Sequence, residues 1–181
     1  MQIKRILQIA KWNLTFSQKA KQKFLRKTFY ECGDFVDYNP KVLPLYPKLV
    51  KFHNNIIIAS GVHFITHDAI NFMINRSIKN GDFKERIGCV EIEDNVFIGA
   101  HSTILYNVKI GSNVIVGANS VVNKDLESNY VYAGVPARKI CTFDQFMQKR
   151  GKLYASVDKN QIITDEEVEN AWALFNLDRH Q

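Results

Sequence analysis

Apolar residues recur at every sixth position through the middle of the chain. From residue 92 the sequence divides without a gap into six hexapeptides, IEDNVF, IGAHST, ILYNVK, IGSNVI, VGANSV and VNKDLE. The same frame appears upstream, over residues 52–69, as FHNNII, IASGVH and FITHDA. The first position of each hexapeptide is aliphatic or aromatic, and the fifth is small or aliphatic except at Asp68. This period excludes an α-helix of about 3.6 residues per turn and a sheet of long strands.

The fourth position of the hexapeptides predicts how the backbone turns. Its members are all Gly, Asn, Asp or His, the residue types that best tolerate a positive φ angle. They are Asn55, Gly61, His67, Asn95, His101, Asn107, Asn113, Asn119 and Asp125. We therefore expect a left-handed backbone turn at every sixth residue, so that three hexapeptides close one triangular coil. Residues 52–69 then form one coil and residues 92–127 form two, with parallel strands around a core of first-position side chains.

Two segments next to the repeats lie outside this register. Residues 31–51 contain three prolines and predict an irregular first coil, with strands near residues 35–38 and 48–52. Residues 70–91 include the polar run NGDFKER and break the register, which predicts a loop excursion out of the coil.

Both ends of the chain predict helices that cap the open ends of the solenoid. Residues 2–30 have no period of six and predict one or two basic amphipathic helices. FDQFMQKR (143–150) predicts a short helix, and a capping box from Thr164 to Glu167 predicts a terminal helix near residues 165–177. The predicted organisation is a basic N-terminal helical segment over residues 1–30, a β-helix domain over 31–142 with the excursion 70–91, and a C-terminal helical cap over 143–181.

The charge of the chain is concentrated at its N-terminus. The formal net charge is +6, yet residues 1–30 contain eight Lys or Arg and no acid, which leaves a sum of −2 for the remainder. A solvated helix face accounts for such a cluster, and a weak attraction to an anionic membrane surface is the second interpretation. Nucleic-acid binding is not expected, because no recognised module accompanies the charge.

The cysteines and the apolar runs favour a cytoplasmic protein. Cys32, Cys89 and Cys141 match no metal-binding spacing, and we expect reduced thiols. No apolar run approaches the roughly 20 residues needed to cross a bilayer, and the N-terminus does not read as a secretory signal. We therefore expect a cytoplasmic location, with the inner face of the membrane as the second interpretation for residues 1–30.

Three stretches carry a resemblance to a known family: IASGVHFITHDA (58–69), NVFIGAHSTILYNVKIGSNVIVGANSVVNKDL (95–126) and VYAGVPARKI (131–140). They resemble the hexapeptide-repeat O-acetyltransferases, which include maltose, galactoside, serine, xenobiotic and polysaccharide acetyltransferases. The resemblance implies a mainly β fold, a left-handed parallel β-helix of hexapeptide repeats with an N-terminal helical segment and C-terminal helices. It also implies a homotrimer with active sites between subunits and acetyl-CoA as the acyl donor. No metal is expected.

The resemblance places the catalytic histidine at His67. Such enzymes use a histidine to take the proton from an acceptor hydroxyl, which then attacks the thioester directly, and imidazole titrates near working pH. His101 shares the fourth position of the repeat and is the alternative base, since turn geometry by itself explains both residues. The other ring nitrogen of the base needs an acceptor, for which Asp68, Glu85 or a backbone carbonyl are the candidates. Asp68 falls in the fifth position, which we expect to face inward, where a buried carboxylate needs partners. A hydrogen bond from the loop backbone to Asp68 is the structural alternative for this residue.

Further residues are assigned to the cofactor by the resemblance. The candidates are Phe97, Ala100, Ala118, Asn123, Lys124, Arg138 and Lys139. The three cations suit the phosphates of CoA, and the two alanines let the pantetheine arm lie close to the backbone. Asn123 stands where relatives often have Thr. Phe97 stands where many have Trp, with core or subunit packing as its other interpretation.

The expected function is acetyl-CoA-dependent O-acetylation of a saccharide hydroxyl, in the modification of a bacterial surface polysaccharide. One alternative is N-acetylation of an amino sugar, for which the base matters less because a neutral amine attacks by itself. A zinc-dependent γ-carbonic anhydrase is disfavoured, because His63, His67 and His101 are too few and poorly placed. A non-catalytic scaffold is the remaining alternative, and it would not bind acetyl-CoA.

Overall fold

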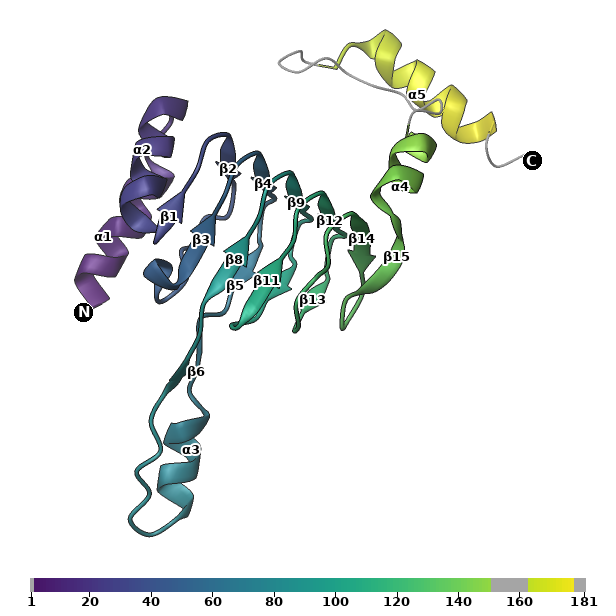
Figure 1. The fold of residues 1–181 in the computed structure, drawn as a ribbon. Coiled ribbons are helices and arrows are strands. Elements are labelled where there is room, and N and C mark those ends of the chain that lie inside the picture. The colour runs from purple at the N-terminus through teal and green to yellow at the C-terminus, as the bar shows by residue number, and fades with distance from the viewer. Residues whose placement is uncertain (1, 151–162, 178–181) are drawn as a thin grey trace. The chain divides into compact units, whose positions relative to one another are not determined.

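Short strands wind into a stack of coils in the middle of the chain, as Figure 1 shows for the computed structural model. The structure describes residues 2–150 and 163–177. Sheet A has the order β1 (Glu31–Cys32), β3 (Val50–Phe52), β8 (Val90–Ile92) and β11 (Val108–Ile110). Sheet B has the order β2 (Val36–Tyr38), β4 (Ile56–Ile58), β9 (Val96–Ile98), β12 (Val114–Val116), β14 (Tyr130–Ala133) and β15 (Arg138–Thr142). Sheet C has the order β5 (His63–Phe64), β10 (Thr103–Ile104) and β13 (Val121–Val122).

The strands pair in the register that the hexapeptides predict. Cα partners in successive coils are 18 residues apart (108 − 90), as for Val90 with Val108 and for Thr103 with Val121. Every pairing between described strands of the three sheets is parallel except that of β14 with β15. The predicted stacking of hexapeptide coils is confirmed. The strands expected near residues 35–38 and 48–52 appear as β2 and β3, and a short 3₁₀ turn (Pro47–Leu49) precedes β3.

The interior is filled by the first and fifth positions of the repeat. All first-position side chains, from Phe52 to Val122, are at most 4% exposed. Burying an aliphatic side chain of this size contributes roughly 1.5–3 kcal/mol to stability. The fifth-position hydroxyls of Ser102 and Ser120 donate to the carbonyl oxygen of Gly117 at 3.0 and 2.7 Å, so their burial leaves no unpaired donor.

Most turns between strands have the left-handed backbone that the fourth position predicts. The φ angle lies between 54° and 72° at seven of the positions. They are Asn55, Gly61, Asn95, His101, Asn107, Asn113 and Asn119. Gly61 is required for a second reason, because a Cβ atom there would lie 2.3 Å from His101 Nδ1.

One corner of the coils carries a ladder of asparagine side chains. Asn55 Nδ2 donates to Asn95 Oδ1 at 2.8 Å, and Asn95 Nδ2 donates to Asn113 Oδ1 at 3.0 Å. Asn113 Nδ2 then donates to Asn129 Oδ1 at 2.8 Å, and Asn129 also has a positive φ of 68°. The same residues therefore turn the backbone within one coil and link it to the next.

Two members of the predicted turn column depart from it, since neither His67 nor Asp125 has a positive φ. Asp125 precedes the last coil, where the pairing of β12 with β14 shortens the spacing to 16 residues (131 − 115). Its carboxylate accepts the backbone N–H of Lys109 at 2.8 Å. His67 opens strand β6 (His67–Asp68), which pairs antiparallel with β7 (Arg86–Ile87) instead of continuing the coil.

An arm leaves the β-helix between β5 and β8 (Figure 1). The β6–β7 pair forms its stem, and helix α3 (Ile70–Ser77) lies beyond the stem. Paired residues of β5 and β10 are 40 positions apart (103 − 63), which is 22 more than one coil. The N–H of Gly88 donates to the carbonyl of Thr66 at 3.0 Å and closes the coil where the arm leaves it. The expected excursion therefore begins at residue 67 rather than 70, and the chain has rejoined the coil before residue 91.

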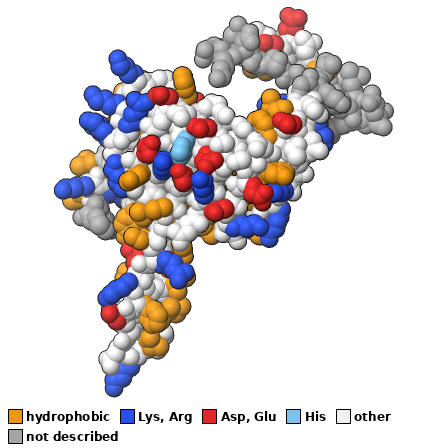
Figure 2. All heavy atoms as spheres, in the orientation of Figure 1, with side chains coloured by type: hydrophobic (Ala, Val, Ile, Leu, Met, Phe, Trp, Pro, Cys, Tyr) orange, Lys and Arg blue, Asp and Glu red, His pale blue; other side chains and the backbone are white. Residues whose placement is uncertain are grey.

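The outward face of sheet A is covered by a network of alternating charges (Figure 2). Lys51 Nζ lies 3.1 Å from Glu31 Oε2 and 3.6 Å from Glu91 Oε1. His53 Nε2 lies 2.8 Å from the same Glu91 oxygen, and Lys109 continues the network toward the next coil. Because these groups are partly exposed, each pair contributes little stability, and the network mainly keeps this face polar.

Two helices cover one open end of the coil stack, as the N-terminal sequence predicts. Helices α1 (Gln2–Asn13) and α2 (Gln18–Thr28) bring Trp12 and Leu25 into the core. Trp12 Nε1 donates to the carbonyl of Pro40 at 2.9 Å. The ring of Phe29, just after α2, lies 4.8 Å from that of Phe52 in β3.

The chain divides into two compact units, residues 1–143 and 144–181. Helices α4 (Phe143–Arg150) and α5 (Asp165–Leu177) have the predicted bounds. The capping box is also confirmed: Thr164 Oγ1 accepts the N–H of Glu167 at 3.2 Å, and Glu167 Oε2 accepts the N–H of Thr164 at 2.8 Å. That these helices cap the second end of the β-helix stays a prediction. Within the described ranges, no helix combines the length and the apolarity that crossing a bilayer requires.

We expect Asn113→Val to lower the free energy of unfolding by about 2–4 kcal/mol, because a β-branched residue is strained at φ 54° and two ladder hydrogen bonds are lost. Asn113→Gly keeps the turn and loses only the hydrogen bonds, so its cost should be about 1–2 kcal/mol. Urea unfolding followed by circular dichroism measures both. Asn123→Val, at an exposed position without a positive φ, is the control. Equal losses for the Val and Gly variants would contradict the requirement for a left-handed turn.

Candidate active site

His67 is the first residue of the arm, at the point where the chain leaves the coil. It follows the fully buried Thr66 and pairs with Ile87 across the stem. Its Nδ1 atom is buried and makes no hydrogen bond to any described residue. The ring of Tyr46 stands edge-on to the imidazole, with centroids 5.6 Å apart. Buried ring nitrogens without a partner are uncommon in folded proteins, and a functional role is one of the explanations for them.

Two hydrogen bonds between tyrosines and carboxylates hold the base of the arm. The hydroxyl of Tyr46 donates to Glu85 Oε2 at 2.8 Å, and the hydroxyl of Tyr106 donates to Asp68 Oδ2 at 2.6 Å. The tyrosines belong to coil segments and the carboxylates to the arm. The two bonds therefore fix the arm against the β-helix at both of its chain segments, at Asp68 where the chain leaves and at Glu85 where it returns.

Asp68 and Glu85, the side chains expected to orient His67, are engaged with other groups. Asp68 Oδ1 accepts the backbone N–H of Ile70 at 3.2 Å, while its second oxygen is held by Tyr106. The expectation that Asp68 points into the core is wrong, because β6 has left the coil and the side chain is only partly buried. The contact with the backbone of the loop, the structural alternative for this residue, is observed.

The same hydrogen bonds set the ionisation of the site. The Tyr106 hydroxyl is the main reason that the pKa of Asp68 lies below its ordinary value. Partial burial opposes this shift, and the Ile70 N–H and the charge of Arg86 assist it. The pKa of Tyr46 is raised, because its proton is held by Glu85 and because the site is partly desolvated. Asp68 is therefore an anion and Tyr46 a neutral donor at neutral pH.

The other histidines of the repeats have structural surroundings. The ring of His101 lies against the backbone of Gly61 at a turn with φ 59°. His63 is exposed on β5. Within residues 2–150 and 163–177, no group of three or more His, Cys, Asp or Glu side chains is placed to hold a metal ion.

The candidate cofactor residues of the coils lie at two corners that flank sheet C. Ala100 and Ala118 stand at equivalent places in the turns before β10 and β13, and the N–H of Asn119 donates to the carbonyl of Ala100 at 2.9 Å. Asn123 and Lys124 come directly after β13 and are exposed. They lie at the corner where the chain leaves sheet C, and His67 lies at the same corner after β5. One chain therefore brings the small residues to one side of sheet C and the histidine and Lys124 to the other.

The remaining cofactor candidates differ in how free they are to meet a phosphate. Lys139 Nζ donates to Glu127 Oε2 at 2.8 Å and lies 3.8 Å from the centroid of the Tyr130 ring. The hydrogen bond to Glu127 is the main reason that the pKa of Lys139 is raised. Arg138 is exposed, donates to the adjacent Ala137 carbonyl, and forms no ion pair with a described residue. Phe97, on the outward face of β9, is 40% exposed.

Sequence reasoning missed Tyr46 and Tyr106. Tyr46 falls in the irregular first coil, where no register predicts its neighbours. Tyr106 carried a usable signal, since it is 40 residues after Thr66 in the same frame as the paired His63 and Thr103. In that frame Tyr106 lies next to Thr66, at the root of the arm. The frame can be applied only when the length of the excursion is known.

Comparisons with known proteins agree with this architecture. Residues 89–124 match the family described as "Bacterial transferase hexapeptide (six repeats)". The protein YvoF of Bacillus subtilis (strain 168) is 31% identical over 151 residues, which cover 81% of this chain and 79% of YvoF. The structure of a maltose O-acetyltransferase from Clostridium difficile 630 matches with a TM-score of 0.58 and 26% identity, over 75% of this chain and 82% of that chain. Galactoside acetyltransferase in complex with coenzyme A matches with a TM-score of 0.60 and 18% identity, over 90% and 88% of the two chains. The repeat and these likenesses imply that the β-helix winds left-handed.

We expect Tyr106→Phe to raise the pKa of Asp68 toward its ordinary value, because the phenol hydrogen bond is the largest cause of its lowering. A carboxyl whose pKa is lowered by folding stabilises the fold above its unfolded pKa, and this contribution is lost as the pH falls through the folded pKa. Carbon-13 NMR titration of the Asp68 carboxyl measures the change. Tyr46→Phe, which removes the bond to Glu85 instead, is the matched control and should leave Asp68 as it is. An unchanged Asp68 titration in Tyr106→Phe would refute the assignment.

Proposed function

The chain belongs to the hexapeptide-repeat acetyltransferases, whose acyl donor is acetyl-CoA, and we propose that it acetylates a saccharide hydroxyl with His67 as the general base. The observation that carries the proposal is the position of His67. It lies at the root of the arm, with a buried Nδ1 that has no hydrogen-bond partner among the described residues and with the Tyr46 ring edge-on to the imidazole. A solvated turn histidine would have none of these features.

In the proposed reaction, the neutral ring of His67 accepts the proton of the acceptor hydroxyl while the hydroxyl oxygen attacks the thioester carbonyl carbon. The new C–O bond forms, and the tetrahedral intermediate then collapses with cleavage of the C–S bond. The departing CoA thiolate takes the proton from the imidazolium. The products are the acetate ester and free CoA, with the ring neutral again, so no nucleophilic side chain is needed.

Asp68 acts in this scheme as a positioning residue. Tyr106 and the Ile70 N–H hold its two oxygens, which fixes the strand β6 that carries His67. The carboxylate thus supports the base through the backbone that carries it.

We propose that the pantetheine arm of acetyl-CoA passes along the corner at Ala100 and Ala118, where small side chains leave the backbone accessible. Phe97 supplies exposed apolar surface beside it. Lys124 and Arg138 bind the phosphates, since both are exposed cations without an ion-pair partner among the described residues. Lys139 contributes less, because it is already paired with Glu127.

The proposal includes a homotrimer whose sites lie between subunits. Two exposed apolar surfaces support it. The arm carries Ile70, Phe72 and Met73, each more than half exposed, and α3 buries no residue within its own chain. The outward face of sheet B carries Ile57, 38% exposed, and Phe97. Association would cover this surface and bring a neighbour's cofactor corner to His67.

The acceptor and its setting rest on chemistry and on the named relatives. Maltose and galactoside acetyltransferases among the matched structures favour a sugar hydroxyl. We place the reaction in the modification of a bacterial surface polysaccharide, on the cytoplasmic side. The free Cys32, Cys89 and Cys141 fit a reducing compartment.

We expect His67→Ala to lower kcat/KM for a sugar hydroxyl acceptor by on the order of 10²–10⁴-fold, while acetyl-CoA binding is retained. Release of the CoA thiol over a panel of saccharides measures this. His101→Asn keeps a residue that tolerates the left-handed turn and is the matched control, with activity near that of the wild type. Full activity in His67→Ala would overturn the assignment of the base. A loss below about tenfold, on an amino sugar only, would indicate N-acetylation instead.

We expect Arg138→Ala and Lys124→Ala each to weaken acetyl-CoA binding by roughly tenfold or more, because each removes a charged hydrogen-bond donor to a phosphate. Lys139→Ala should weaken acetyl-CoA binding less, since the Lys139 ammonium group already donates to Glu127. Isothermal titration calorimetry gives the affinities, and light scattering on the same samples gives the mass of the assembly. Absence of acetyl-CoA binding to the wild type would favour a scaffold, and a monomer would refute the trimer.

A further inference from the structure

Helix α1 has a broad apolar surface, and the chain buries only one edge of it. The buried edge carries Trp12, 5% exposed, and Ile9, which packs against the core. At about 3.6 residues per turn, Ile3 and Leu7 fall on the side away from Trp12, and Ile6 lies between Ile3 and Ile9. Ile3, Ile6 and Leu7 are 74%, 64% and 63% exposed. An apolar stripe of this kind on the outside of a helix indicates a second partner for it.

The exposed apolar surface continues into the turn between the two helices. Leu14 and Phe16 lie between α1 and α2 and are 71% and 84% exposed. Both belong to residues 1–30, which contain no acid. Figure 2 shows Lys and Arg side chains gathered at the end of the β-helix unit where α1 and α2 lie.

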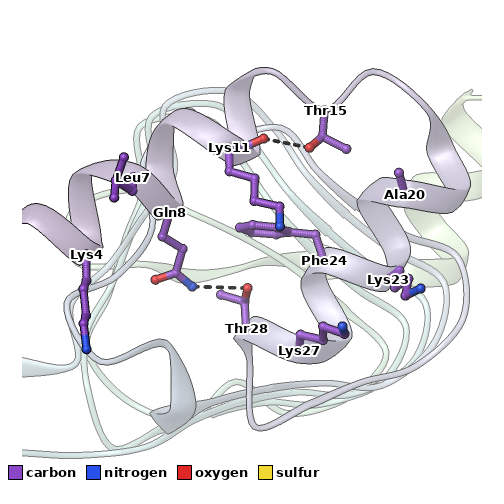
Figure 3. Close-up of a pocket in the computed structure, with 10 residues that line it drawn as sticks. All are labelled: Lys4, Leu7, Gln8, Lys11, Thr15, Ala20, Lys23, Phe24, Lys27 and Thr28. Atoms are coloured by element: carbon purple, nitrogen blue, oxygen red, sulfur yellow. Dashed lines mark hydrogen bonds between the residues drawn. The ribbon is translucent and has the colours of Figure 1, made fainter.

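A cleft of about 640 Å³ between the helices is lined by four lysines (Figure 3). Lys4 and Lys11 come from α1, and Lys23 and Lys27 come from α2, with Phe24 among the apolar side chains of the lining. None of the four forms an ion pair with any residue in the described part of the chain. Four uncompensated cations around one cleft favour an anionic partner.

We propose that α1, the turn at Leu14 and Phe16, and α2 dock on an anionic phospholipid bilayer. The exposed apolar side chains enter the boundary between head groups and acyl chains, and the lysines of the cleft bind the head-group phosphates. Interleaved apolar and basic side chains without acids are the composition of an interfacial helix. A second copy of the chain fits less well, because it would bring two unneutralised lysine clusters together. Nucleic acid would leave Ile3, Leu7 and Phe16 in water.

The docking surface is separate from the acetyl-transfer site. It lies at the N-terminal end of the coil stack, whereas His67 lies at the root of the arm. The proposal therefore stands or falls independently of the reaction. It makes the protein peripheral to the membrane, since the helices lie on the surface and the apolar side chains reach only into its outer layer.

Vesicle flotation of the full-length protein tests the proposal. We expect the protein to float with vesicles of phosphatidylcholine and phosphatidylglycerol, and to stay at the bottom with phosphatidylcholine alone. Lys4→Glu/Lys11→Glu should weaken partitioning by on the order of 10-fold or more, and raised salt should release the wild type. Ile3→Ser/Leu7→Ser keeps the charge of the helix and should weaken partitioning to the vesicles by about tenfold or more.

Lys79→Glu/Lys149→Glu is the charge-matched control, since both lysines are exposed and lie far along the chain from α1 and α2. It should float as the wild type does. If this control lost as much vesicle binding as Lys4→Glu/Lys11→Glu, binding would depend on net charge alone and the proposal would be overturned. Absence of flotation by the wild type would overturn it as well. Light scattering identifies the competing occupant: an oligomer that Ile3→Ser/Leu7→Ser dissociates would assign the surface to a second copy. Acetyl-CoA calorimetry on every variant verifies that the transfer site is intact.

Discussion

The left-handed backbone turn at the corners of the coil is the constraint on which the rest of the structure depends. A residue with positive φ every six positions ends one short strand and starts the next, and three such turns return the chain to the same sheet. Asn is suited to this place twice over. It tolerates the turn, and in Asn55, Asn95 and Asn113 its amide also bonds to the equivalent residue of the next coil. Regular spacing in turn places every first-position side chain in the core.

The candidate active site lies where this constraint is released. At His67 the backbone does not take the left-handed turn, and the chain runs out into an antiparallel stem instead of the next strand. The hydrogen bond from the Gly88 N–H to the Thr66 carbonyl closes the coil at the base of the arm. The strands before and after the arm therefore keep the pairing register of the β-helix. Tyr46 and Tyr106 then tie the stem to neighbouring coils. The β-helix thereby holds His67 in a defined position, and no flexible loop is needed to support it.

The surfaces of the β-helix unit are chemically distinct. Alternate side chains of each strand face outward, and the outward-facing residues differ from sheet to sheet. Sheet A presents paired charges around Glu91, while sheet B presents apolar residues such as Ile57 and Phe97. The N-terminal helices add a third kind of surface, basic and apolar at once. We propose a different neighbour for each surface: water for the first, another subunit or a cofactor for the second, and an anionic interface for the third.

The sequence by itself determined the hexapeptide register, the core positions, the left-handed turns at seven places and the helix bounds near the C-terminus. These depend on local backbone preference and on periodicity, which a single chain displays directly. Only the tertiary structure decided the surroundings of His67 and Asp68. The fourth-position pattern included His67 as one more turn, and the fifth position sent Asp68 inward. Both expectations failed because the stem partner in β7 lies 20 residues away from His67 (87 − 67) and competes successfully with the local preference. The Tyr106 contact to Asp68 likewise depends on how coils stack across the arm, and long-range pairing of this kind leaves no local signature in the sequence.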